Sequence, residues 1–130
     1  MRIYTLNEAR LLLPEVEPVV LQMQRAAREI RAIRAAAAQA ARGASGDGNL
    51  LADPWTESGA DPLDTLSVSI QQASAQLEAW GIELKDPERG LIDFYWRRDG
   101  ELVYLCWHLG EDEIRYWHTL TAGFAGRQPI

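Results

Sequence analysis

The chain has 130 residues, of which 47% are hydrophobic and 25% charged, and its formal net charge is −6. This length and balance are typical of a single globular domain with its own hydrophobic core. The negative charge argues against general affinity for nucleic-acid backbones. The single cysteine, Cys106, excludes an internal disulfide and fits a reducing compartment. Because no stretch has the length of a signal peptide's apolar region or of a membrane span, we expect a cytoplasmic protein that does not engage a membrane.

The first helix signal is a capping box at Thr5-Leu6-Asn7-Glu8, in which each side chain accepts from the other residue's backbone N–H. A short helix is therefore predicted at 6–13. Pro14 disfavours helical geometry in the residue before it and suits a first helical turn, so a second helix is predicted from there, after a bend, to about residue 42. Apolar residues of this helix form a heptad seam: Val16, Val19, Met23, Ala26, Ile30, Ile33, Ala37 and Ala40.

Residues 43–61 are rich in Gly, Ser and Asp, and we expect a mobile, loop-like insert there. Asp61-Pro62 is typical of an N-cap followed by a first helical residue, and Gly81 is typical of a helix end. Between them, apolar residues again recur in steps of three and four. The two seams predict an antiparallel helical hairpin over residues 5–81, in which each helix covers the other's apolar stripe.

Residues 82–130 are predicted to be β-rich, with a possible edge strand at 82–84. Asp99-Gly100, between two apolar stretches, is the strongest short signal for a β-hairpin, and a two-residue loop fixes its register. On one face this register pairs apolar residues only: Trp96 with Val103, Phe94 with Leu105, and Ile92 with Trp107. The opposite face is mixed and pairs Tyr95 with Tyr104, Asp93 with Cys106, and Leu91 with His108.

Residues 113–120 alternate like a third strand, although helical spacing also fits, and the tail at 123–130 is expected to be an irregular loop. The predicted fold class is α+β: a long antiparallel helical hairpin packed on one face of a small antiparallel β-sheet, as a single domain of residues 1–130.

The first candidate site is a possible metal site, because thiolate, imidazole and carboxylate groups are the common ligands of zinc and similar metals. Its residues are Cys106, His108, Glu111, Glu113 and His118. The loop length decides whether His118 joins Cys106, since a pairing of Trp107 with Ile114 would turn His118 to the other face. The alternative is that Cys106, His108 and His118 have only structural roles. Asp93, Tyr95 and Tyr104 share the face of Cys106 and complete the possible site.

Two further roles are weighed for single residues. Cys106 as a nucleophile would use His108 as its base, but the facing Asp93 would raise the pKa of the thiol. Arg127, between glycine-rich turns, is a possible anion contact; alternatively it pairs with one of the nearby acids, Glu111, Asp112 or Glu113.

The remaining surface features indicate interaction rather than catalysis. The arginines of the long helix are interpreted as a solvated face, and nucleic-acid binding is not expected. Uncharged polar residues on the outer face of the last helix, 62–80, are compatible with burial against another subunit. We therefore expect a non-enzymatic binding or interaction module, homodimeric through its helices. The alternative is a small metal-dependent enzyme or metal-binding protein that uses the Cys106/His108/His118 region, with a divalent transition metal such as zinc.

Two stretches of the chain are similar to a known family. The first is Tyr4-Thr5-Leu6-Asn7-Glu8-Ala9-Arg10 with Leu12-Leu13-Pro14. The second includes Gly81-Ile82-Glu83-Leu84, Gly90-Leu91-Ile92-Asp93-Phe94, Val103-Tyr104-Leu105-Cys106-Trp107 and Ile114-Arg115-Tyr116-Trp117-His118. Together they resemble the bacterial family of uncharacterised proteins called domain of unknown function 2203. The resemblance spans the chain apart from 43–61 and implies a single bacterial domain; it implies no activity, cofactor or site residue.

Overall fold

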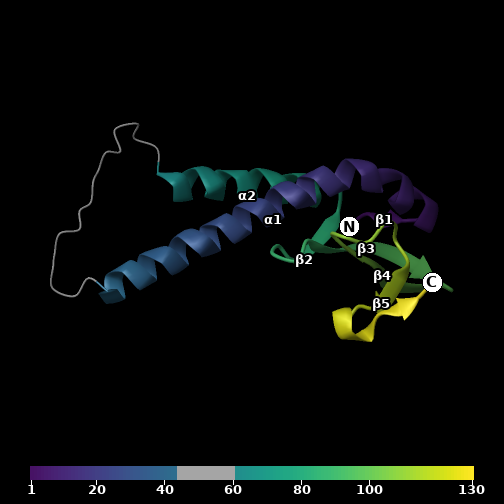
Figure 1. Cartoon of the computed structure of the whole chain (residues 1–130). Helices are drawn as coiled ribbons and strands as arrows, with labels where there is room; N and C mark the ends of the chain where they lie inside the picture. The colour runs from purple at the N-terminus through teal and green to yellow at the C-terminus, as the bar shows by residue number, and fades with distance from the viewer. Residues whose placement is uncertain (44–60) are drawn as a thin grey trace.

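The computed structural model describes residues 1–43 and 61–130, and these form two α-helices and a sheet of six strands (Figure 1). The elements, in chain order, are β1 (Ile3–Tyr4), α1 (Leu6–Gly43), α2 (Pro62–Ala79), β2 (Ile82–Asp86), β3 (Leu91–Arg98), β4 (Glu101–His108), β5 (Tyr116–Thr119), the short 3-10 helix η2 (Phe124–Gly126) and β6 (Gln128–Pro129). The α+β class is confirmed. The predicted insert lies, except for its two end residues, outside the described residues.

Helix α1 begins at the predicted capping box: Glu8 N–H donates to Thr5 Oγ1 at 3.0 Å, and Thr5 N–H donates to Glu8 Oε1 at 2.9 Å. The prediction of two helices separated at Pro14 is wrong, because α1 continues through both Pro14 and Pro18. Its buried residues run on through the prolines: Ala9, Leu13, Val16, Val20, Met23 and Ala26. Burial of this single apolar stripe outweighs the backbone hydrogen bonds that the prolines cannot donate. Figure 1 shows the N-terminal part of α1 bending towards the sheet.

Helix α2 begins as predicted, with Asp61 Oδ1 accepting from Leu63 N–H at 2.9 Å and Pro62 in the first turn. The two helices lie side by side, and Gln22 of α1 donates to Ser69 of α2. Because α2 has 18 residues and α1 has 38, the seam of α1 is covered for only part of its length. The seam was predicted to continue to Ala37 and Ala40, but both are exposed.

The sheet has the order β1-β3-β4-β5-β6, and β2 also pairs with β3. All six predicted pairs of the β3–β4 hairpin are confirmed, and its turn residues Asp99 and Gly100 have φ angles of 52° and 84°. The prediction of an antiparallel sheet is wrong in one respect, since β1 pairs with β3 in parallel and makes the sheet mixed. A third strand is confirmed as β5, whereas the predicted irregular tail contains η2 and β6.

The core joins both helices to the sheet. One cluster of buried residues contains Val16 and Met23 of α1, Leu77 of α2, and Phe94 and Trp107 of the sheet. Tyr4 of β1 also belongs to this cluster, and its Oη donates to the carbonyl oxygen of Trp80 at 2.5 Å, which ties β1 to the end of α2. Phe94 and Trp107 belong to the apolar face of the hairpin, so the chemically active residues of β3 and β4 lie on the other face.

Candidate functional site

The register of β5 decides which residues share the mixed face of the sheet. Tyr104 pairs with His118 and Cys106 pairs with Tyr116, so His118 lies on the same face as Cys106. The alternative pairing of Trp107 with Ile114 is not formed. Asp93 stands directly opposite Cys106 on β3. Three neighbouring strands therefore each supply one polar side chain to the same place.

These three residues form a buried polar centre. One donor atom from each of Asp93, Cys106 and His118 lies within 4.8 Å of the others, and their exposed fractions are 1%, 1% and 2%. His118 Nε2 lies 3.1 Å from Asp93 Oδ2 and 3.2 Å from Asp93 Oδ1. The other ring nitrogen, Nδ1, lies 2.7 Å from the carbonyl oxygen of Thr119. Both edges of the imidazole are thus held against acceptors, which fixes its orientation.

The contacts of His118 determine where its protons lie. A carbonyl oxygen only accepts, so Nδ1 must carry a proton that it donates to Thr119. A second proton lies between Nε2 and the Asp93 carboxylate, on one or the other. Burial raises the pKa of Asp93, and the nearby imidazole acts in the opposite direction. The pair therefore has no net charge, which makes its burial tolerable.

Cys106 is a protonated thiol at neutral pH. Burial, followed by the facing Asp93 carboxylate, raises the pKa of Cys106 to about 12, against the opposing influence of Arg127. A nucleophilic cysteine needs the reverse, a lowered pKa and solvent access. The geometry therefore argues against the nucleophile hypothesis, and it leaves a thiol that becomes a thiolate only if something displaces its proton.

His108 lies on the same face of the sheet, but together with Glu111 it belongs to a different group of contacts. His108 Nδ1 is 2.8 Å from the carbonyl oxygen of Leu109, and its backbone N–H donates to Glu111 Oε1 at 2.9 Å. Arg127 Nη2 donates to the same Glu111 oxygen at 2.6 Å and to the carbonyl oxygen of Cys106 at 3.2 Å. The predicted anion contact, Arg127, is thus paired within the chain.

The C-terminal tail covers part of this face. The guanidinium of Arg127 lies 4.3 Å from the ring centre of Tyr116 and 4.7 Å from that of Phe124, and its side chain is 12% exposed. Its Nε is buried and has no partner among the described residues. Glu113, the remaining predicted ligand, lies elsewhere and forms ion pairs with Arg10 and Arg115 at the surface.

The two predicted tyrosines flank the centre. The ring of Tyr104 lies 5.4 Å from that of His118, and Tyr104 Oη donates to Tyr95 Oη at 3.3 Å. This hydrogen bond, together with some burial, raises the pKa of Tyr95 to about 12. Lys85 of β2 lies over the ring of Tyr104, with Nζ 4.5 Å from the ring centre. Sequence reasoning missed Lys85, since its position at the site depends on where β2 pairs with β3.

A small cavity adjoins the centre. It has a volume of about 170 Å³, and Asp93 and His118 form part of its wall. The rest of the wall comes from β2, β3, β4 and the residues after β5: Lys85, Leu91, Tyr104, Leu120, Thr121, Gly123 and Phe124. Two of the three residues of the buried centre therefore border a space of the size of a small molecule.

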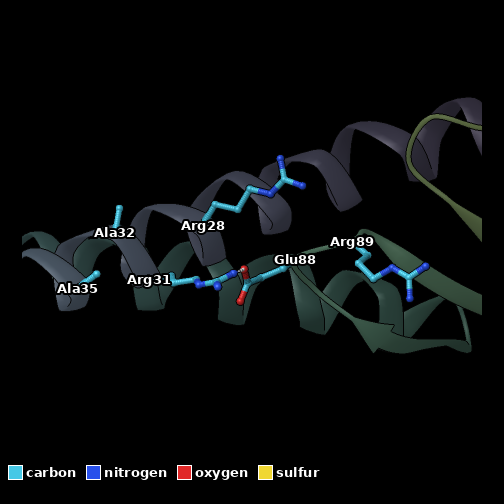
Figure 2. A pocket seen from close by; sticks show the side chains of 6 residues that line it. All are labelled: Arg28, Arg31, Ala32, Ala35, Glu88 and Arg89. Atoms are coloured by element: carbon cyan, nitrogen blue, oxygen red, sulfur yellow. Dashed lines mark hydrogen bonds and ion pairs between the residues drawn. The ribbon is translucent and has the colours of Figure 1, made fainter.

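A larger groove of about 520 Å³ lies on the surface between α1 and the β2–β3 turn (Figure 2). Arginines dominate its lining, but Arg31 Nη1 is bound to Glu88 Oε1 at 2.8 Å. Figure 2 shows the guanidinium groups of Arg28 and Arg89 pointing away from this pair rather than towards one common point. The groove thus lacks the convergent donors of a built anion site.

In the comparison with protein families, the chain matches the family described as uncharacterized conserved protein (DUF2203) over residues 2–130. The chain belongs to the DUF2203 family. No curated protein and no solved structure matches it. Membership of DUF2203 confirms the resemblance seen in the sequence, and here the match includes the 43–61 segment. None of the described helices has the length and apolar character needed to cross a membrane.

Proposed function

We propose that this DUF2203 protein binds a divalent transition metal, with zinc as the reference ion, through Asp93, Cys106 and His118. The observation that carries the proposal is the meeting of a carboxylate oxygen, a thiol sulfur and an imidazole nitrogen within 4.8 Å, in a buried place. This donor set suits zinc and its borderline-soft neighbours better than magnesium or calcium, which take oxygen ligands.

The orientation of His118 supports this proposal. Metal-bound histidines usually donate their second ring N–H to a carbonyl or carboxylate, which fixes the ring and leaves the other nitrogen for the metal. Here Nδ1 donates to Thr119, and Nε2 points to Asp93. The backbone of β5 thus already holds the His118 ring in the orientation that a metal ligand needs.

The distances require only a small adjustment. Zinc–ligand bonds of about 2.0–2.3 Å at tetrahedral angles place neighbouring donor atoms about 3.3–3.8 Å apart. The pair of Nε2 and Asp93 Oδ2 already lies at 3.1 Å, and the widest donor separation is at most 4.8 Å. A movement of about 1 Å, available from rotation of a cysteine side chain, closes the set.

Charge balance gives a further reason. A bound dication together with the Asp93 carboxylate and the Cys106 thiolate has no net charge. The metal ion would therefore replace two protons, one from the Cys106 thiol and one from the Asp93–His118 pair, and the site would stay neutral. We take the helical hairpin to cover the opposite face of the sheet, because Ile92 and Phe94 share one core cluster with Val16 and Val20. The metal face would then be the face of the sheet that the helices leave uncovered.

The test is the metal content of protein purified without chelators and without metal-affinity resin. We expect about one zinc per chain after loading and dialysis, and a thiolate-to-cobalt charge-transfer band when cobalt replaces zinc. Cys106→Ser, Asp93→Asn and His118→Gln should each reduce retained metal at least tenfold. His108→Gln is the matched control: it lies on the same strand face, outside the centre, and should retain the metal.

Two results would overturn the proposal. One is a folded wild-type protein, verified by circular dichroism, that retains no zinc and gives no cobalt band. The other is equal metal loss in His108→Gln and His118→Gln, because the ligands would then not be the three residues named. The cobalt charge-transfer band reports the Cys106–metal bond directly. Circular dichroism separately identifies a variant that has unfolded, so that loss of structure is not counted as loss of a ligand.

A further inference from the structure

We propose that the cavity beside Asp93 and His118 binds a small monocarboxylate, with its charged oxygens between the metal centre and Lys85. This inference rests on the proposed metal function, because the ligand would occupy the open position of that centre. Three protein ligands leave a tetrahedral zinc with one position for an exogenous molecule. Asp93 and His118 both border the cavity, so the open position faces it.

The size of the cavity limits the ligand. A volume of about 170 Å³ corresponds to roughly five or six water-sized groups at about 30 Å³ each. This is well below the roughly 300 Å³ at which pockets for drug-sized molecules begin. An organic acid with a chain of two to four carbons fills such a space, whereas a nucleotide or a sugar phosphate does not fit.

The composition of the wall indicates the chemical class. Leu91, Leu120 and Phe124 offer an apolar surface on the side of β3 and of residues 120–124. Lys85 offers the one ammonium group, held 3.5 Å from Tyr104 Oη. A metal centre with a carboxylate and a thiolate is neutral, so Lys85 is then the one cation on the cavity wall, and a monoanion matches it. A dianionic phosphate would leave a charge uncompensated.

Lys85 is also the only lysine in the chain, against twelve arginines. A compact ammonium on a flexible stem acts as a point charge that can turn towards a ligand. Its second contact, Glu83 at 3.5 Å, is partly exposed and salt-screened, so Lys85 remains available to a ligand. The single lysine is thus placed where its particular chemistry is useful.

The experiment uses the full chain loaded with cobalt, titrated with propionate, and with phosphate for comparison. We expect propionate to change the visible ligand-field bands, and Lys85→Met to weaken this effect roughly tenfold. Arg97→Met, which removes a cation from β3 outside the cavity, should have no effect. As an independent readout, zinc-loaded protein labelled with ¹⁵N-lysine gives a single lysine amide resonance, which propionate should shift and which should not shift without metal.

The outcomes separate the two proposals. Absence of any cobalt band refutes the metal centre itself. A normal thiolate–cobalt band that propionate leaves unchanged refutes the ligand inference and leaves the centre standing. Equal responses to phosphate and propionate refute the ligand class, and equal behaviour of Lys85→Met and Arg97→Met refutes the role of Lys85.

Discussion

Two glycines with similar backbone conformations provide a test of how tightly the sheet packs on α1. Gly90, in the β2–β3 turn, has a φ angle of +64°, and Gly100, in the hairpin turn, has a φ angle of +84°. Alanine at either position is strained by roughly 1–2 kcal/mol, because a Cβ is disfavoured in the left-handed region. Alanine also reduces the conformational entropy of the unfolded chain, which offsets about 0.4–1 kcal/mol of this strain. We expect Gly100→Ala to lower the free energy of unfolding by about 1 kcal/mol, since a Cβ there would meet nothing within 4 Å.

Gly90→Ala carries the same strain and a packing cost as well. Its Cβ would lie 2.6 Å from Cγ and Cδ1 of Leu109 and 3.0 Å from Cγ1 of Val20, so side chains must move. Overpacking of this kind costs about 1–3 kcal/mol, which brings the expected loss to about 2–4 kcal/mol. Gly90 also holds the end of the hairpin, because Leu109 N–H donates to its carbonyl oxygen at 3.2 Å.

Urea unfolding followed by circular dichroism measures both losses, and the melting temperature gives a second measure. For a chain of this size, 1 kcal/mol corresponds to a shift of roughly 3–5 °C. Equal destabilisation of the two variants would refute the reasoning, because it would mean that Val20 and Leu109 yield without cost and that the turn is not pressed against α1.

Three further outcomes are expected. The apparent zinc affinity should fall about a hundredfold for each unit of pH below 8, because zinc must displace two protons: that of the Cys106 thiol, whose pKa burial raises to about 12, and the one that Asp93 and His118 share; calorimetry between pH 6 and 8 would show only about a tenfold fall per unit if Cys106 were not a ligand. Glu111→Gln should lower the free energy of unfolding by about 1–3 kcal/mol, since it leaves the largely buried Arg127 without its counter-charge, and a change below about 0.5 kcal/mol in urea unfolding would contradict this. Light scattering at micromolar concentration should give a mass near twice 14.6 kDa that decreases in Gln72→Glu, whereas a monomer at all concentrations would remove the predicted helical interface.

The sequence predicted most accurately where the structure is set by neighbouring residues. Asp99-Gly100 requires positive φ angles at both positions, and a two-residue turn leaves one register, so every pair between β3 and β4 followed. The cap at Thr5 and the start of α2 at Asp61 are equally local. The break at Pro14 was predicted wrongly because a local preference was weighed without the buried stripe that continues past it.

Features set by distant residues could not be predicted in this way. Ile3–Tyr4 is a two-residue strand whose partner is some ninety residues away, so it leaves no local pattern. The place of His118 depended on the conformation of the loop before β5, for which two registers were equally consistent with the sequence. Asp93 was assigned to the site face, and its position opposite Cys106 was predicted, but it was not counted as a ligand. Counting Asp93, which stands opposite Cys106 on the neighbouring strand, as a ligand together with Cys106 and His118 would have identified the centre.

The parallel pairing of β1 with β3 has a consequence for the order in which the chain folds. β3 and β4 meet after a two-residue turn, and β5 follows after a short loop, so the meander closes at little entropic cost. Tyr4 and Trp96 are separated in sequence by both helices, and contacts over such distances form late and slowly. β1 lies on one side of β3, whereas β4 and β5, which supply Cys106 and His118 to the polar centre, lie on the other side. We therefore expect β1 to dock late and its docking to complete the core, because it buries Tyr4 and forms the hydrogen bond of Tyr4 to the carbonyl oxygen of Trp80.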